Sequence, residues 1–93
     1  MAIPKQYTIT ELTDGTLIGP TRITLADKLA WEKTARHQGW NVENNAVTMN
    51  AFLAWAAAKR TGAFTGSFDE YMDQAVDVAI TDGDDMDPTQ PAA

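Results

Sequence analysis

The chain has 93 residues, no cysteine and a formal net charge of −6, and 44% of its residues are apolar. This length allows one small domain with a thin core, and the lack of cysteine excludes disulfide bonds and thiolate metal sites. There is no signal-peptide pattern and no apolar run of roughly 18 residues, so we expect a soluble protein.

The negative charge is concentrated at the C-terminal end. Residues 1–81 hold nine acidic and seven basic side chains, whereas residues 82–93 hold four aspartates and no basic residue. Neither part has the excess of basic residues with which proteins bind nucleic acids or anionic membranes. We therefore expect no nucleic-acid partner and no membrane partner.

The N-terminal part is predicted to form a β-hairpin over residues 5–24. Residues 7–12 alternate and are rich in β-branched side chains, Asp14-Gly15 is a turn signal, and residues 16–24 can return as a second strand. Gly19-Pro20 interrupts that second strand, which predicts an edge strand or a bulge.

The first helix is predicted over residues 25–38. Thr24 and Asp27 have the spacing of a capping box, and Gly39 is a favoured stop. One apolar stripe runs along this helix, formed by Leu25, Ala26, Leu29 and Ala30. Trp31 lies almost opposite that stripe on a face that is otherwise polar. It is therefore a candidate for contact with a partner, and burial beneath the hairpin is the equal alternative.

The second helix is predicted over residues 46–61, with Gly62 as its stop. Its main apolar stripe contains Met49, Phe52, Leu53 and Ala56. The reverse side carries the small residues Ala51, Ala54 and Ala58, and Trp55 lies on the flank between the two sides. Small residues permit close approach by another helix or another subunit, so the alanines and Trp55 are candidate partner-binding residues, although Trp55 is best interpreted as core.

A third helix is predicted over residues 68–76, because Ser67 and Glu70 form a capping box. Residues 76–80 alternate, and they can either finish this helix or form a short strand against the hairpin. Residues 82–93 are expected to be a disordered acidic tail. The predicted fold is thus a single α+β domain over residues 1–81, mostly helical, with an N-terminal hairpin followed by three helices.

The sequence predicts no catalytic, cofactor or metal site. His37 is the only histidine, and a surface or capping role suits its place near a helix end. The tail aspartates fail the calcium-loop pattern, and the glycine turns lack the spacing that cradles phosphate. We therefore expect an interaction module with no enzyme activity.

Three segments, residues 55–62, 68–71 and 76–80, resemble the tail assembly chaperones of long-tailed bacteriophages. They contain Trp-Ala-Ala-Ala-Lys-Arg-Thr-Gly, then Phe-Asp-Glu-Tyr, then Val-Asp-Val-Ala-Ile. The resemblance implies a non-enzymatic protein of the host cytoplasm that binds the tape measure protein, keeps it soluble, recruits tail tube protein around it and leaves the finished virion. It also implies that a longer, frameshifted form can exist, which a protein sequence does not reveal.

A mechanism follows as a hypothesis: amphipathic helices of the client lie in an apolar groove, and several copies, or homo-oligomers, act together along it. Two other functions remain open at this point. One is a small acidic DNA mimic that inhibits a host nucleic-acid-binding protein, and the other is a minor structural subunit of the virion.

Overall fold

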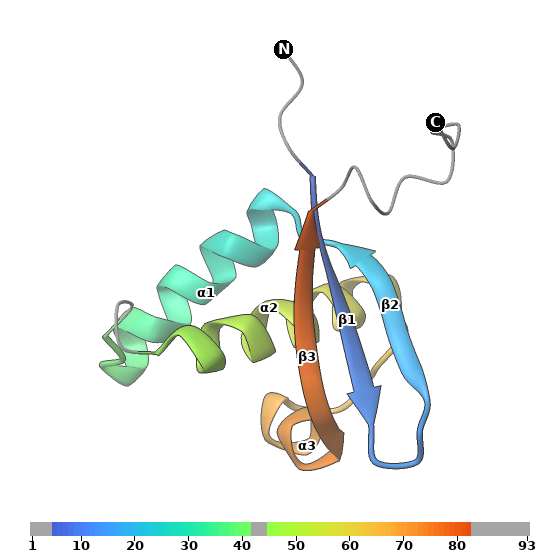
Figure 1. The fold of residues 1–93 in the computed structure, drawn as a ribbon. Helices are drawn as coiled ribbons and strands as arrows, with labels where there is room; N and C mark the ends of the chain where they lie inside the picture. The colour runs from blue at the N-terminus through green and yellow to red at the C-terminus, as the bar shows by residue number, and fades with distance from the viewer. Residues whose placement is uncertain (1–4, 42–44, 83–93) are drawn as a thin grey trace.

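The computed structural model describes residues 5–41 and 45–82. Its elements follow in the order β1 (Gln6–Leu12), β2 (Leu17–Arg22), α1 (Leu25–Gln38), α2 (Ala46–Thr61), α3 (Phe68–Gln74) and β3 (Ala75–Asp82). The strands form one antiparallel sheet, and α2 crosses a face of that sheet and contacts all three strands (Figure 1). The C-terminal segment after residue 82, which we expected to be a tail, lies outside the described residues.

The predicted fold class is wrong, because the sheet has a third strand. Its order is β2-β1-β3, so the first strand in the chain is the central one. β3 pairs with β1 from Gln6 opposite Asp82 to Leu12 opposite Ala75. The fold is therefore a compact α+β domain with a three-stranded antiparallel sheet and three helices, in place of a hairpin followed only by helices.

The hairpin is confirmed, and its second strand is both bulged and at the edge. β2 pairs with β1 from Tyr7 opposite Arg22 to Glu11 opposite Leu17, with a register shift beside Ile9. Gly19 lies at this irregularity with φ 112°, and a side chain there would collide with the carbonyl oxygen of Thr8. Glycine is required at this position because the left-handed region and the close backbone approach both exclude a Cβ atom.

The first two helices have the predicted bounds, and capping residues mark the start of α1 and the ends of both helices. The Thr24 N–H donates to Asp27 Oδ2 over 2.9 Å, and the Thr24 hydroxyl accepts from the Asp27 N–H, which completes a capping box for α1. Gly39 ends α1 and Gly62 ends α2, and both adopt the left-handed conformation typical of helix C-termini.

The third helix is shorter than predicted. The Ser67–Glu70 capping box forms as expected, but α3 ends at Gln74, where the prediction extended it to residue 76. Ala75 already has extended backbone angles and begins β3. The Gln74 carbonyl accepts a hydrogen bond from the Thr13 N–H over 2.9 Å, so the hairpin turn holds the point where the helix becomes a strand.

The core lies between α1, α2 and the sheet, and α1 turns toward it with the face opposite to the predicted one. Trp31 and Ala35 are buried with Ile23, Phe52 and Leu53. Leu25 and Leu29, from the predicted apolar stripe, are 71% and 55% exposed. A buried tryptophan removes more apolar area from water than either leucine would, which favours this orientation.

One ion pair ties α1 to the end of α2. Arg60 Nη2 lies 3.2 Å from Asp27 Oδ2 and also donates to the Arg22 carbonyl over 2.7 Å. Asp27 is buried and Arg60 is 37% exposed. The same carboxylate therefore caps one helix and anchors another, which fixes how α1 lies on α2.

Within residues 5–41 and 45–82, none of the helices is both long enough and apolar enough to cross a bilayer.

Candidate functional site

The predicted partner-binding residue Trp31 is an interior residue. Its ring stacks on Trp40 with the centroids 5.7 Å apart and contacts Phe52 at the same distance. Trp31 packs against α2, on the face of α1 opposite the predicted apolar stripe. Trp31 is therefore unable to contact a partner unless α1 moves.

The alanine face of α2 is also internal. Ala54 and Ala58 are buried in a small cluster with Tyr71 of α3. The Tyr71 hydroxyl donates to Thr10 Oγ1 in the central strand, which locks α3 against the sheet. Burial raises the pKa of Tyr71 above its ordinary value of 10.0, and the hydrogen bond with Thr10 opposes that shift in part. These alanines permit the close approach of α3 within the chain.

Trp55 is half-buried and makes several internal contacts. Its indole Nε1 donates to the Gly66 carbonyl over 3.0 Å, and Phe52 and Phe68 contact it edge-on. Lys59 Nζ lies 4.9 Å from the ring centroid. The ring therefore stabilises the link between α2 and α3, with one side opening into a shallow aromatic cleft of about 470 Å³.

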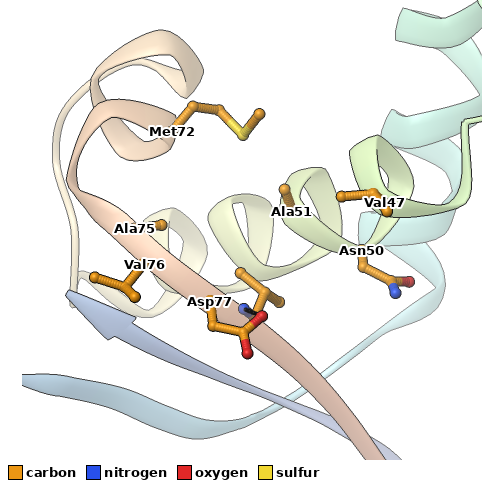
Figure 2. A pocket seen from close by; sticks show the side chains of 8 residues that line it. Val47, Asn50, Ala51, Met72, Ala75, Val76 and Asp77 are labelled. Carbon is orange, nitrogen blue, oxygen red and sulfur yellow. Dashed lines mark hydrogen bonds between the residues drawn. The ribbon is translucent and has the colours of Figure 1, made fainter. Parts of the chain in front are cut away.

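A different surface gathers exposed apolar side chains from three elements. It is a groove of about 260 Å³ between the N-terminal half of α2, α3 and β3 (Figure 2). Val47 of α2 is 81% exposed, Val76 of β3 is 59% exposed and Met72 of α3 is 43% exposed. The complete lining is Val47, Asn50, Ala51, Met72, Ala75, Val76, Asp77 and Val78.

Local sequence patterns explain how these side chains reach the groove. Val47, Asn50 and Ala51 have the i, i+3, i+4 spacing of one helix face, next to the face that carries Phe52 into the core. Met72 comes from the exposed side of α3, close to the turn into β3. Of the five predicted partner-binding residues, Ala51 lines this groove, and the other four do not.

The groove carries one charged side chain. Among the described lining residues, Asp77 is the only one that ionises, and its Oδ1 accepts a hydrogen bond from the Val78 N–H over 2.8 Å. On β1, Glu11 lies directly opposite Asp77. The rim of the groove is therefore acidic and its floor is apolar, which suits a partner with apolar and basic side chains.

Two other surfaces fit an apolar partner less well. The outer face of α1 exposes Leu25 and Leu29, but it is a convex helix surface with Glu32 and Arg36 on the same side. A cleft of about 420 Å³ beside Leu25 is lined by the basic residues Lys5, Arg22 and Lys28. The groove combines concave shape with exposed apolar side chains, so we take it as the candidate site.

The structure bears on two of the residue groups that were considered as possible metal or catalytic sites. His37 is exposed in the last turn of α1. Within the part of the chain that the structure describes, His, Cys, Asp and Glu side chains do not gather in groups of three or more that could hold a metal ion. The aspartates at positions 84, 85 and 87 lie outside that part.

Comparison of this chain with protein-family models, with curated proteins and with solved structures found no match.

Proposed function

We propose that this chain is a tail assembly chaperone of a long-tailed bacteriophage, which binds the tape measure protein in the groove between α2, α3 and β3. Bound copies keep the client soluble and promote assembly of tail tube protein around it, in the host cytoplasm and without enzyme activity. The proposal includes release of the chaperone before the virion is complete.

The observation that carries the proposal is the exposed apolar groove. A soluble 93-residue chain rarely leaves Val47 and Val76, which line the same groove, so exposed unless another chain covers them. An acidic rim around Asp77 also disfavours self-aggregation of the free protein through this surface. Both properties suit a protein that must capture a long apolar client and remain soluble.

The segments that resemble the phage family support the proposal through their positions. Residues 55–62 form the C-terminal half of α2, residues 68–71 begin α3, and residues 76–80 lie in β3. Residues 76–80 supply Val76, Asp77 and Val78 to the groove. The other two segments do not line it, but they hold α2, α3 and the sheet together through the Trp55–Gly66 and Tyr71–Thr10 hydrogen bonds. The resemblance therefore covers the framework of the site.

Co-expression with the tape measure protein from the same genome tests this function. The variant Val47→Asp introduces a charge on the groove floor, and Leu17→Asp is its matched control, because Leu17 is an exposed apolar residue on the β2 edge. Both side chains are exposed, so each change is expected to alter folding stability by no more than about 1 kcal/mol, which includes the repulsion between a carboxylate at position 17 and Glu11 opposite it.

We expect the wild-type chain and Leu17→Asp to keep the tape measure protein soluble and to co-purify with it, and Val47→Asp to lose both effects. The proposal fails if the solubility of the tape measure protein is the same when this chain is omitted. Mass spectrometry of purified virions tests the release step, and recovery of the chain from them would contradict it.

A further inference from the structure

The two edges of the sheet differ in their capacity to accept another strand. β2 carries Pro20, which has no N–H to donate, and its pairing is irregular beside Gly19. β3 contains eight residues, Ala75–Asp82, with no proline and no glycine. Proline and bulges are the usual means by which natural sheets block an edge, so β2 is protected and β3 is not.

The backbone groups of β3 that face the open side follow from the register. The Ile23 N–H donates to the Gln6 carbonyl. The backbone N–H and C=O groups of the even-numbered residues of β1 therefore point toward β2, and those of the odd-numbered residues point toward β3. Ile9 faces Ala79, and the alternation leaves the N–H groups of Val78 and Ile80 directed away from β1. In agreement, the Val78 N–H donates to the Asp77 carboxylate beside it.

The groove lies directly beside this open edge. Figure 1 shows that the N-terminal half of α2 extends past β3 on the side away from β1. Val47, Asn50 and Ala51 of that half line one side of the groove, and Asp77 lies across from them on β3 (Figure 2). Val78 of β3 also lines the groove. The sheet therefore does not reach over the N-terminal half of α2.

We propose that the client segment binds in an extended conformation, as a fourth strand paired with β3, in place of the helix-in-groove mode expected from the sequence. Alternate side chains of this strand are apolar and cover Val47 and Met72. The remaining side chains of the client strand lie on the sheet face that carries Asp77 and Glu11, and we expect them to be basic. Asp77 and Glu11 lie opposite one another and repel, and a basic side chain beside them relieves that repulsion. This inference rests on the proposed function for the client's identity, whereas the binding mode rests on the edge and the groove.

Binding changes two hydrogen bonds at this edge. The incoming strand supplies carbonyl acceptors for the Val78 and Ile80 N–H groups, and the Asp77 carboxylate is released from Val78 to meet a lysine or arginine of the client. A helix lying in the same groove would cover Val47 and leave both N–H groups without a new acceptor. Amide hydrogen exchange therefore separates the two modes.

The probe is an end-capped peptide of about nine residues in which valine and lysine alternate. We expect it to slow exchange of the Val78 and Ile80 amides of the full-length chain by roughly tenfold or more, with little change at Ala79, which already bonds to β1. A peptide that alternates valine and glutamate is the matched control and leaves all three amides unchanged. Binding of the valine-lysine peptide without protection of Val78, or the absence of binding at millimolar concentration, overturns the inference.

The variant Asp77→Lys provides a second test. Asp77 is exposed, so the fold is retained, and the charge at the rim is reversed. The valine-glutamate peptide is then expected to protect Val78 and the valine-lysine peptide to lose its effect. An unchanged preference for lysine would contradict the charge argument.

Exchange in the complex with the tape measure protein separates the inference from the proposed function. Retention of the client without protection of Val78 refutes strand addition and leaves the chaperone function standing. Protection by the valine-lysine peptide together with no retention of the tape measure protein refutes the function and leaves the binding mode standing.

Discussion

Replacement of Asp27 by alanine removes two connections at once. The carboxylate accepts the Thr24 N–H at the start of α1, and it accepts from Arg60 Nε over 3.3 Å and Nη2 over 3.2 Å at the end of α2. Loss of the first leaves a helix N-terminus without part of its cap. Loss of the second leaves Arg60 with only the Arg22 carbonyl as a partner.

The magnitude follows from these two connections. Half of a capping box contributes about 0.5–1 kcal/mol. Hydrogen bonds between charged groups contribute about 1.5–3 kcal/mol, and we reduce this to about 1–2 kcal/mol because Arg60 is 37% exposed and partly screened. We therefore expect Asp27→Ala to lower the free energy of unfolding by about 1.5–3 kcal/mol, or the melting temperature by roughly 6–24 °C.

Urea unfolding followed by tryptophan fluorescence measures this loss, because Trp31 is buried in the core between α1 and α2 and Trp55 packs against that core. Asp27→Asn keeps one carbonyl oxygen for the Thr24 N–H, so it is expected to cost about 1 kcal/mol less than alanine. A double-mutant cycle with Arg60→Met isolates the ion pair and should give a coupling of about 1 kcal/mol. A loss below about 0.5 kcal/mol for Asp27→Ala, or no coupling to Arg60, refutes this account.

Three further predictions test other contacts. Tyr71 has a raised pKa when folded, so its contribution to stability is complete below pH 10 and is lost as the pH rises above that value. Tyr71→Phe should remove this part of the loss of stability above pH 10, and it should lower the free energy of unfolding by about 1 kcal/mol at neutral pH. An unchanged dependence of the unfolding free energy on pH above 10 would contradict this prediction. Gly19→Ala should destabilise by about 1–3 kcal/mol more than Gly15→Ala, because the added methyl group meets the Thr8 carbonyl at Gly19 and open space at Gly15. Ala58→Leu should cost about 1–3 kcal/mol by overfilling the contact with Tyr71, whereas Ala46→Leu on the exposed start of α2 should cost little; equal melting temperatures would place the alanine face outside the core.

The helices were predictable from sequence wherever their limits are set by neighbouring residues. Thr24 with Asp27, Gly39 and Gly62 act over one helical turn, and α1 and α2 have the predicted bounds. The hairpin and its irregular second strand were predictable for the same reason, since Asp14-Gly15 and Gly19-Pro20 act locally.

Features that depend on distant contacts were not predictable in this way. The alternation of residues 76–80 is compatible with a helix end or a strand, and pairing with Gln6–Leu12 decides between them. The buried face of α1 carries the polar residues Asp27 and Thr34 beside Trp31, which hides it from a search for apolar periodicity. The ion pair with Arg60 makes burial of Asp27 possible, and that contact spans 33 positions in the chain.

The candidate site was missed for a related reason. The groove is lined by residues from three elements, among them Val47, Met72 and Val76. A local sequence pattern does not predict how far the sheet extends over α2. The only available signal was the position of Val47 and Ala51 on one helix face outside the main stripe of α2.

The order of strands in the sheet has a consequence during synthesis of the chain. β1 is made first, but its second neighbour, β3, is the last of the elements to leave the ribosome. Until residue 82 emerges, one side of β1 cannot be fully paired. The nascent protein can therefore form its hairpin and two long helices early, whereas the sheet closes only in a late step that joins the two ends of the domain.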